Sequence, residues 1–449
     1  GYGLGAAGIE KLAAGGARVM ITVDCGAVSH AEIALANQRG MDVIVCDHHQ
    51  VAATRPPALA VINPIEPDAG FPFPGLCGAG VAFYLALGTR MRLRERGGPV
   101  PDLRRLLDLV ALGTVADLVP VVEENRVLVK YGLRELATST RPGISALKRV
   151  AGVAQLNSSA VGFRLAPRLN AGGRLDDAMR SLELLTTDDG AEAERLAAAL
   201  DDENRARQAI EREMVDEAIA MVEASGGLGQ RRSLVLASPA FHPGVVGIVA
   251  ARLVERYYRP TLLIAAEAGG VGRGSGRSIA GVDLYAALAA CGDLLERFGG
   301  HRMAVGLSLD LARLDALAAR FDAEIAARTS AEDFVPQVRV DAELSLRAVD
   351  AGCLADLARL EPFGTGNPEP LFLSRDVRVR DRRIVGERHL KLVLEQDGRS
   401  LQAIGFGMAD MTVAAGDRVD VLYGIMANES NGSVFAELRL RDLRPAGAP

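Results

Sequence analysis

Several kinds of residue are scarce in this 449-residue chain, and each scarcity excludes a class of protein. There is no tryptophan, and aromatic residues make up only 4% of the sequence. No run of about 18 uncharged apolar residues occurs, so a membrane-spanning helix is not expected. The five cysteines lack CxxC spacing, which argues against a zinc site or a disulfide framework and predicts a reducing, cytoplasmic location.

Lysine is also scarce. Arginine supplies nearly all of the 51 positively charged side chains. The net charge of −6 argues against non-specific wrapping of duplex DNA, although it is compatible with a local basic cleft. Arginine is well suited to phosphate, because its planar guanidinium group offers several donors at once. An alternative explanation for this usage is the base composition of the genome.

The segment over 41–49, MDVIVCDHH, changes abruptly from apolar to polar. Its apolar part is rich in β-branched residues and is typical of a buried parallel strand. Asp47, His48 and His49 follow this strand directly. Because ligands bind just beyond the carboxyl ends of strands in open α/β sheets, an acid and two imidazoles at this place indicate a metal site.

Two further acids are expected to join this group. Asp24 follows the apolar stretch 17–23, and a helix expected over 29–39 leads to the next strand, as in a parallel crossover unit. Asp117 follows an apolar helix. Carboxylates with imidazole suit Mn²⁺ or Mg²⁺, and two such ions can promote hydrolysis of a phosphoester. For each residue alone, the alternative is an ordinary turn-capping acid or loop histidine.

A competing pattern is present at the start of the sequence. Gly3, Gly5 and Gly8 match GxGxxG, and Asp24 lies near the spacing of a ribose-binding acid, which is typical of an NAD-binding fold. The strand that should precede this motif is not in the sequence. This interpretation also leaves the Asp-His-His group without a role, so the metal site is preferred.

Two segments rich in glycine and arginine predict contacts with phosphate. The stretch 271–278, VGRGSGRS, is interpreted as a loop whose backbone N–H groups and arginines hold an oxyanion, with a flexible surface hairpin as the alternative. Loops with one short helix are expected over 142–170. Near the end of this part lie Arg168, Asn170 and Arg174, which contact nucleic acid in one interpretation and provide helix caps and surface charge in the other.

The order of expected elements predicts four parts and an α/β fold class with an added β domain. Turn signals at Asp397-Gly398 and Asn431-Gly432 support hairpins near the C-terminus, and 361–370, EPFGTGNPEP, is interpreted as a hinge-like linker. The predicted parts are 1–141, with a parallel sheet; 142–225, a connecting segment with a long helix; 226–330, a second α/β domain; and 335–449, an OB-like β-barrel.

The sequence resembles the DHH phosphoesterase superfamily and, within it, the RecJ-type single-strand-specific DNA exonucleases. VDCG and CDHH mark only the superfamily, whereas PRLNAGGR, the long helix and the terminal β region together indicate the RecJ type. The other matching segments are GTVADLVP, HPGVVGIVAARLVERYYRP, GRGSGRS, FGGHRMAVGLSL and EPFGTGNPEP. The resemblance implies a DHH phosphoesterase domain over 1–141 and a DHHA1 substrate-binding domain over 226–330.

The resemblance also implies roles for individual residues. Asp24 corresponds to an acid that bridges two metal ions, and His48 and Asp117 correspond to ligands of one ion. His49 corresponds to the residue facing the scissile phosphate, and Asp47 to the side chain that orients it. The resemblance implies that Ser275 and Arg277 hold the 5′ phosphate of the strand end and that His301 belongs to the glycine–histidine motif of the substrate domain. The glycine- and arginine-rich segments themselves predict further substrate contacts by Arg168, Asn170, Arg174, Arg273 and Gly276.

The activity implied by the resemblance is Mn²⁺- or Mg²⁺-dependent hydrolysis of single-stranded DNA from a 5′ phosphate end, with release of mononucleotides in recombination and repair. A monomer is expected, with single-strand-binding protein and a repair helicase as partners. The family's first motif, Asp-x-Asp, is absent, so we expect an N-terminally truncated chain that holds part of the metal cluster and can be inactive alone. The alternatives are an oligonucleotide nuclease or nucleotide-bisphosphate phosphatase of the same superfamily, and a non-catalytic DNA-binding scaffold.

Overall fold

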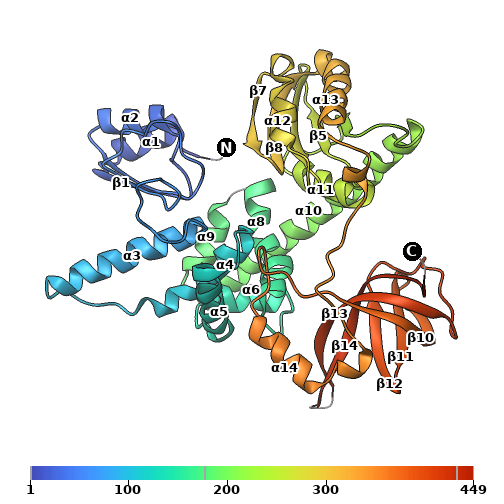
Figure 1. The fold of residues 1–449 in the computed structure, drawn as a ribbon. Coiled ribbons are helices and arrows are strands. Elements are labelled where there is room, and N and C mark those ends of the chain that lie inside the picture. The colour runs from blue at the N-terminus through green and yellow to red at the C-terminus, as the bar shows by residue number, and fades with distance from the viewer. Residues whose placement is uncertain (1–2, 176–177, 431–432, 448–449) are drawn as a thin grey trace. The chain divides into compact units, whose positions relative to one another are not determined.

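The computed structural model describes residues 3–175, 178–430 and 433–447, and Figure 1 shows the elements that they form. The chain folds as two compact units. The first contains residues 1–140, 153–166 and 339–449, and the second contains residues 141–152 and 167–338. Within the described ranges, no helix has the length and apolar character needed to cross a membrane.

The first unit begins with a parallel sheet of three strands in the order β1-β2-β3. Val43 and Val45 of β2 are fully buried in the core that the sheet forms with its two helices. The parallel register places Val23 beside Cys46, so the residues that follow both strands leave the same edge of the sheet. The predicted strand–helix–strand unit is confirmed by α1 (Ala6–Ala14), β1 (Val19–Val23), α2 (His30–Gln38), β2 (Asp42–Cys46) and β3 (Ala60–Ile62).

Helices follow this sheet in the first unit. The apolar helix α4 is mostly buried, and Asp117 forms its C-cap. Helix α5 packs closely on α4 at Gly132, where a Cβ atom would collide with the Leu107 carbonyl. The helical elements are α3 (Gly78–Glu95), η1 (Leu103–Leu106), α4 (Leu107–Ala116), α5 (Glu123–Thr138), α7 (Ser158–Ala160) and the π-helical turn η2 (Val161–Leu165).

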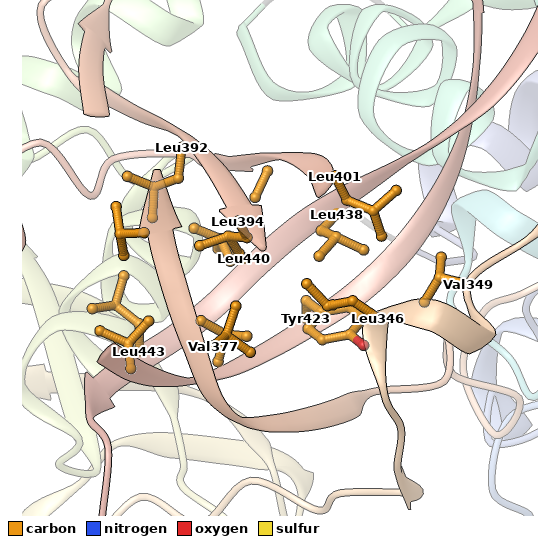
Figure 2. Packing of buried hydrophobic residues seen from close by; sticks show 14 of the residues in the cluster. Leu346, Val349, Val377, Leu392, Leu394, Leu401, Tyr423, Leu438, Leu440 and Leu443 are labelled. Atoms are coloured by element: carbon orange, nitrogen blue, oxygen red, sulfur yellow. The ribbon is translucent and has the colours of Figure 1, made fainter. Parts of the chain in front are cut away.

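The C-terminal part of the first unit is a closed β-barrel, which confirms the OB-like prediction. Its strands pair in the order β11-β12-β14-β13-β10, and β10 pairs again with β11 to close the barrel. Figure 2 shows Leu392, Tyr423 and Leu438 among the buried side chains of its core. The elements are β9 (Ala342–Glu343), η6 (Leu346–Ala348), α14 (Ala351–Leu360), β10 (Phe372–Val385), β11 (His389–Gln396), β12 (Arg399–Gly405), β13 (Arg418–Ser430) and β14 (Ser433–Pro445).

The second unit contains the long helix that the sequence predicts. Helix α10 has 35 residues and contacts α6 and α9, with Leu196 and Leu200 buried. Asp189 caps its N-terminus by accepting hydrogen bonds from the backbone N–H groups of Ala191 and Glu192. The helices of this part are α6 (Pro142–Val150), α8 (Ala166–Leu175), α9 (Met179–Thr186) and α10 (Gly190–Ala224).

The rest of the second unit is an α/β domain with a mixed five-stranded sheet in the order β4-β5-β6-β8-β7. Its apolar core includes Leu262, Leu307 and Phe321. The elements are β4 (Leu234–Ser238), α11 (Val246–Tyr257), β5 (Thr261–Ala266), β6 (Val271–Arg277), α12 (Leu284–Ala289), η3 (Gly292–Leu294), β7 (Arg297–His301), β8 (Ala304–Asp310), η4 (Leu311–Arg313), α13 (Leu314–Arg328) and η5 (Glu332–Phe334).

Three local predictions are wrong. The supposed loop over 271–278 is mostly the central strand β6, and the supposed loops over 142–170 are mainly helical. In the second case Pro142 begins α6, where a missing N–H is tolerated. The alternating pattern of the sequence also predicts a short strand over 337–341, but no strand covers these residues in the described structure, where only the short β9 follows. The turn predicted at 431–432 lies outside the described residues.

Candidate metal centre

Asp24 is placed by an unusual backbone turn at the end of β1. Its φ angle is +62°, in the left-handed region that Asp adopts more readily than most residues. Its N–H donates to the Cys46 carbonyl at 2.9 Å, which holds the turn against the neighbouring strand. Helix α3 begins beside it at Gly78, where a Cβ atom would collide with the Asp24 carboxylate. Glycine at position 78 therefore leaves room for this side chain.

Asp47 is buried and fully engaged in hydrogen bonds. Its Oδ1 accepts from the N–H of His48 at 2.8 Å and from the N–H of His49 at 3.2 Å, and its Oδ2 accepts from the N–H of Ala27 at 2.9 Å. Burial alone would raise the pKa of Asp47, but these hydrogen bonds, with that of the His49 ring, hold the pKa below its ordinary value. Asp47 is thus ionised, and it holds the backbone of His48 and His49 in place.

The His49 ring is oriented by the same carboxylate. Its Nδ1 lies 2.8 Å from Asp47 Oδ1, and because an ionised carboxylate only accepts, Nδ1 carries the proton. The other ring nitrogen, Nε2, is then available as a lone pair in neutral His49. Asn63 donates to the His49 carbonyl at 2.9 Å and fixes the backbone from the other side.

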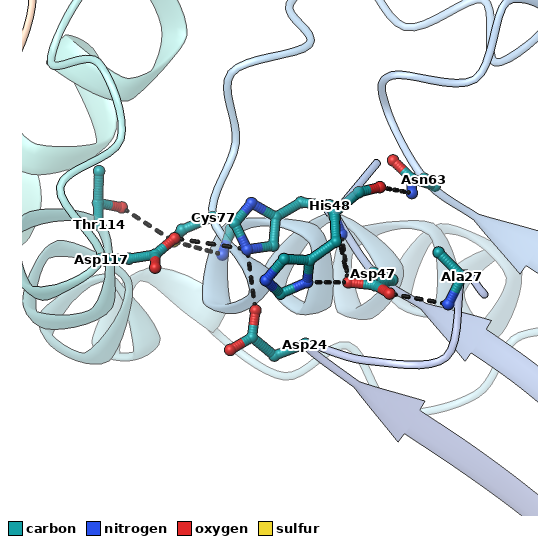
Figure 3. A network of polar contacts seen from close by, with 10 residues as sticks. Asp24, Ala27, Asp47, His48, Asn63, Cys77, Thr114 and Asp117 are labelled. Carbon is teal, nitrogen blue, oxygen red and sulfur yellow. Dashed lines mark hydrogen bonds and ion pairs between the residues drawn. The ribbon is translucent and has the colours of Figure 1, made fainter. Parts of the chain in front are cut away.

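His48 is the centre of the cluster shown in Figure 3. Its Nε2 lies 2.9 Å from Asp24 Oδ1 and 3.4 Å from Asp117 Oδ2, and only 12% of its side chain is exposed. The Asp24 carboxylate raises the pKa of His48 more than burial lowers it, and Asp117 adds to the effect. Despite these short distances, Nε2 has no well-aligned hydrogen-bond partner among the described residues.

Asp117 is supported by the contact between α3 and α4. Thr114, one turn before Asp117, donates to the Val110 carbonyl at 2.7 Å and lies 3.4 Å from the Cys77 sulfur, at the start of α3. Burial raises the pKa of Asp117, the nearby His48 opposes this rise, and Asp24 adds to it. Two acids therefore converge on one imidazole, which favours a shared cation.

This arrangement fits a divalent metal ion. Ligand atoms of Asp24, His48 and His49 all lie within 4.8 Å of one another, and Asp117 approaches the same imidazole. A buried imidazole nitrogen without an aligned partner, next to carboxylate oxygens, is the donor set that Mn²⁺ or Mg²⁺ can share. The structure brings together the residues grouped from the sequence, and their individual ligand roles stay predictions.

The predicted phosphate site in the second unit lies on a β-strand, and not on the glycine-lined loop that the sequence suggested. Because β6 lies between β5 and β8, its backbone belongs to the sheet and cannot form a glycine-lined anion nest. Gly272 and Gly276 face packed side chains, since a Cβ at Gly276 would lie 2.5 Å from Leu262. The prediction of an oxyanion-binding loop is therefore wrong, and the side chains of the strand remain as candidate contacts.

Those side chains alternate with the glycines and point to the opposite face. Arg277 Nη1 donates to Ser275 Oγ at 3.0 Å and to the Gly276 carbonyl at 2.7 Å. Gly247, in the first turn of α11, lies directly over the pair, because a Cβ there would be 2.9 Å from Arg277 Nη2 and 3.1 Å from Ser275 Oγ. Arg273, on the same face, lies 3.4 Å from Glu267.

The remaining predicted contact residues are dispersed within the second unit. His301 is the exposed last residue of β7. Arg168 donates to the buried carboxylate of Asp201 at 2.8 Å, so its guanidinium has a clear structural partner. Asn170 is exposed on α8, and Arg174 belongs to the same helix. Their substrate roles stay predictions.

Two supporting residues were missed from the sequence. Asn63 is 3% exposed and follows β3, so a polar residue after a third parallel strand was the available signal. Gly78 carries no such signal, because only the packing of α3 against the end of β1 shows why a side chain is excluded there.

Comparison with known proteins gives a consistent result. Three family models match the chain: DHH family, N-terminal domain, over 8–114; DHHA1 domain over 232–327; and RecJ OB domain over 340–442. These matches and the site define a protein of the DHH class. The chain is 41% identical to the single-stranded-DNA-specific exonuclease RecJ of Dickeya dadantii, over 99% of this chain and 80% of that protein.

Other relatives agree. RecJ of Bacillus subtilis is 37% identical over 98% of this chain, which spans 56% of that protein. The crystal structure of RecJ with Mn²⁺ from Thermus thermophilus has a TM-score of 0.86 and 35% identity, and the match covers 99% of this chain and 64% of that one. A Mg²⁺ complex from the same organism has a TM-score of 0.75 and 33% identity, with coverages of 99% and 70%. The chain belongs to the RecJ family.

Proposed function

We propose that the protein carrying this chain hydrolyses single-stranded DNA from the 5′ end and releases mononucleotides, in recombination and repair. The observation that carries this proposal is the convergence of Asp24 and Asp117 on His48, beside a His49 ring held by a buried carboxylate. The exonuclease names of the relatives and the Mn²⁺ and Mg²⁺ complexes of similar structures support it.

Asp24, His48 and Asp117 would hold Mn²⁺ or Mg²⁺. Such an ion supplies Lewis-acid polarisation of the phosphodiester and lowers the pKa of water. The two carboxylates offset the positive charge, and His48 must be neutral to offer its lone pair. The Asp24 side chain is 58% exposed and that of His48 only 12%, so a ligand would reach the cluster at Asp24.

His49 is the residue best placed to contact the scissile phosphate. Its ring is 60% exposed, and Asp47 fixes the orientation by holding Nδ1–H. When protonated, the ring would donate from Nε2 to a phosphate oxygen and stabilise the negative charge that develops there. Asp47 acts through His49 and does not itself need to contact the substrate.

In the second unit, Ser275 and Arg277 would hold the 5′ phosphate. Their polar groups lie beside the first turn of α11, and an Arg–phosphate pair next to helix N–H groups is a favourable anion site. The side chains of Arg273 and His301 extend the proposed substrate contacts, whereas the backbone of Gly276 is paired within the sheet. Arg168, Asn170 and Arg174 are proposed to contact the strand from α8, although Arg168 is already paired with Asp201.

The barrel offers a place for a nucleobase. Phe406 follows β12 and is 52% exposed. The His389 ring lies 5.3 Å from it, and the Arg439 guanidinium lies 5.7 Å from its centroid. Strands 2 and 3 of an OB barrel, here β11 and β12, are the usual nucleic-acid face, and stacking on an exposed aromatic ring tolerates any base.

The proposal also covers the domain limits, the location and the partners of the protein. We place the domain limits at 1–141, 142–225, 226–330 and 335–449, in keeping with the ranges of the three matching families. The protein would act as a cytoplasmic monomer, with single-strand-binding protein and a repair helicase as partners.

The test is hydrolysis by the full-length protein that carries this chain. A 5′-phosphorylated single strand, the same strand in a blunt duplex and a dinucleotide would be compared in Mn²⁺. We expect mononucleotides from the long single strand, little from the duplex, and loss of activity in Asp117→Ala. Hydrolysis of the dinucleotide alone, or equal cutting of the duplex, would contradict the proposal.

A further inference from the structure

Asp117 ends α4, where its N–H donates to the Gly113 carbonyl at 2.9 Å, and the chain then continues as a more exposed loop. Leu118 has a φ angle of +61° and is 71% exposed, and 41% of the Asp117 side chain is exposed. Beyond the end of α4, the path of this loop depends on what contacts the following residues, 120–122. These residues are held from two sides.

One side is fixed by Asn125, a fully buried residue of α5. Its Nδ2 donates to the Pro120 carbonyl at 2.9 Å and to the Gly75 carbonyl at 2.6 Å. Gly75 lies two residues before Cys77, at the start of α3. Asn125 therefore ties the loop to the helix that packs against Asp24.

The other side is covered by Gly364, Thr365 and Gly366, which we call the 364–366 turn. The N–H of Val121 donates to the Thr365 carbonyl at 2.6 Å. A Cβ at Gly364 would lie only 2.6 Å from Val121 Cγ2, and one at Gly366 would lie 3.3 Å from Pro120 Cβ. The turn thus packs its backbone directly on the loop, which leaves no room for a side chain at position 364.

The 364–366 turn is itself fixed. Gly364 and Asn367 exchange backbone hydrogen bonds of 2.9 and 3.1 Å, and Asn367 Nδ2 donates to the Leu360 carbonyl at 3.0 Å. Arg126 Nη2 donates to the carbonyls of Arg359 and Leu360 at 2.9 and 3.2 Å, at the end of α14. These contacts hold the segment over 361–370 against the rest of the first unit. They do not fit the hinge-like linker expected from its sequence.

We propose that the 364–366 turn is a positioning element of the metal centre, which keeps the Asp117 carboxylate beside His48. The inference rests on the proposed metal-dependent function and gives the segment leading into the barrel a part in metal affinity. Groups that support metal ligands without touching the metal typically change affinity by about 10–100-fold when they are altered. Because the turn acts through the backbone of Val121, we expect an effect near the lower end, about 10-fold.

The decisive variant is Gly364→Ala, measured by calorimetric titration with Mn²⁺. The single methyl group would collide with Val121 Cγ2 and displace the loop, so the dissociation constant should rise about 10-fold. In the double variant Gly364→Ala/Val121→Ala the colliding methyl group is gone, and the next nearest atom, Val121 Cβ, lies at 3.3 Å. This double variant should recover most of the wild-type affinity.

The matched control is Gly88→Ala, the same substitution at a position of the first unit where an added Cβ meets nothing within 4 Å. It should bind Mn²⁺ as the wild type does. Unchanged affinity in Gly364→Ala, or no recovery in the double variant, would overturn the inference. If Gly364→Ala fails to fold, Arg126→Gln removes the hydrogen bonds to α14 without adding atoms, and unchanged affinity there would also overturn it. A wild type that binds no Mn²⁺ would instead refute the proposed function itself.

Discussion

Replacing Asp47 with Asn tests how the His49 ring is oriented. Asp47 is 1% exposed, and its two oxygens accept hydrogen bonds from three backbone N–H groups and the His49 ring. Asn keeps the shape but has one oxygen. If that oxygen faces His48 and His49, its NH₂ group faces the N–H of Ala27, and two buried donors oppose each other.

The unsatisfied donors lower the free energy of unfolding. Each buried donor left unsatisfied costs about 1–3 kcal/mol, and two donors are left so here, so the first unit should lose at least this much stability. The loss of negative charge also weakens the preference for a proton on His49 Nδ1. In a hydrolase triad, the equivalent Asp-to-Asn change lowers kcat by about 10⁴-fold through the wrong tautomer. We expect at least about 100-fold here, with little change in KM.

The tautomer can be read directly. Long-range ¹⁵N–¹H NMR spectra of histidine-labelled protein should show a protonated Nδ1 for His49 in the wild type and a mixture in Asp47→Asn. Asp42→Asn is the matched control, because Asp42 is an exposed carboxylate on the same strand. A variant at Asp47 that keeps the wild-type tautomer and the wild-type kcat would refute the reasoning.

Three further predictions use other parts of the molecule. Gly78→Ala should displace the Asp24 carboxylate and weaken Mn²⁺ binding in a titration, and unchanged affinity would contradict this. Phe406→Ala should weaken binding of a single-stranded oligonucleotide by about 1–3 kcal/mol in fluorescence anisotropy, without changing Mn²⁺ affinity. Burial raises the pKa of Tyr423 to about 12, whereas an unfolded tyrosine titrates near 10. The unfolded chain therefore loses this proton first, and wild-type stability should fall between these pH values by on the order of 3 kcal/mol. In thermal melts the Tyr423→Phe variant should lack this part of the alkaline loss, and parallel pH profiles would contradict the assignment.

The sequence was sufficient where the signal is local. The change from apolar to polar residues marks the ends of β1 and β2, and parallel pairing then requires Asp24 and Asp47 to leave the same edge. The polar group after each strand can therefore be located from the sequence alone. Helix α10 was predicted for a similar reason, since its charged and apolar positions alternate with helical spacing over its 35 residues.

The sequence failed where distant packing decides the structure. Glycines in β6 indicate a loop locally, yet Gly272, Gly274 and Gly276 are there because side chains of neighbouring strands fill the space that a Cβ would need. The same holds for Gly364, whose neighbour Val121 is more than 200 residues away in the chain. Such contacts leave no periodic pattern, so only the fold shows what these glycines do.

The most direct measurement of the central claim is a crystal structure of the protein soaked with Mn²⁺, using the anomalous signal of the metal. We predict a peak bonded to His48 Nε2, with carboxylate oxygens of Asp24 and Asp117 in the same coordination sphere. A protein that crystallises with these side chains intact but shows no peak there, or binds Mn²⁺ only elsewhere, would contradict the claim.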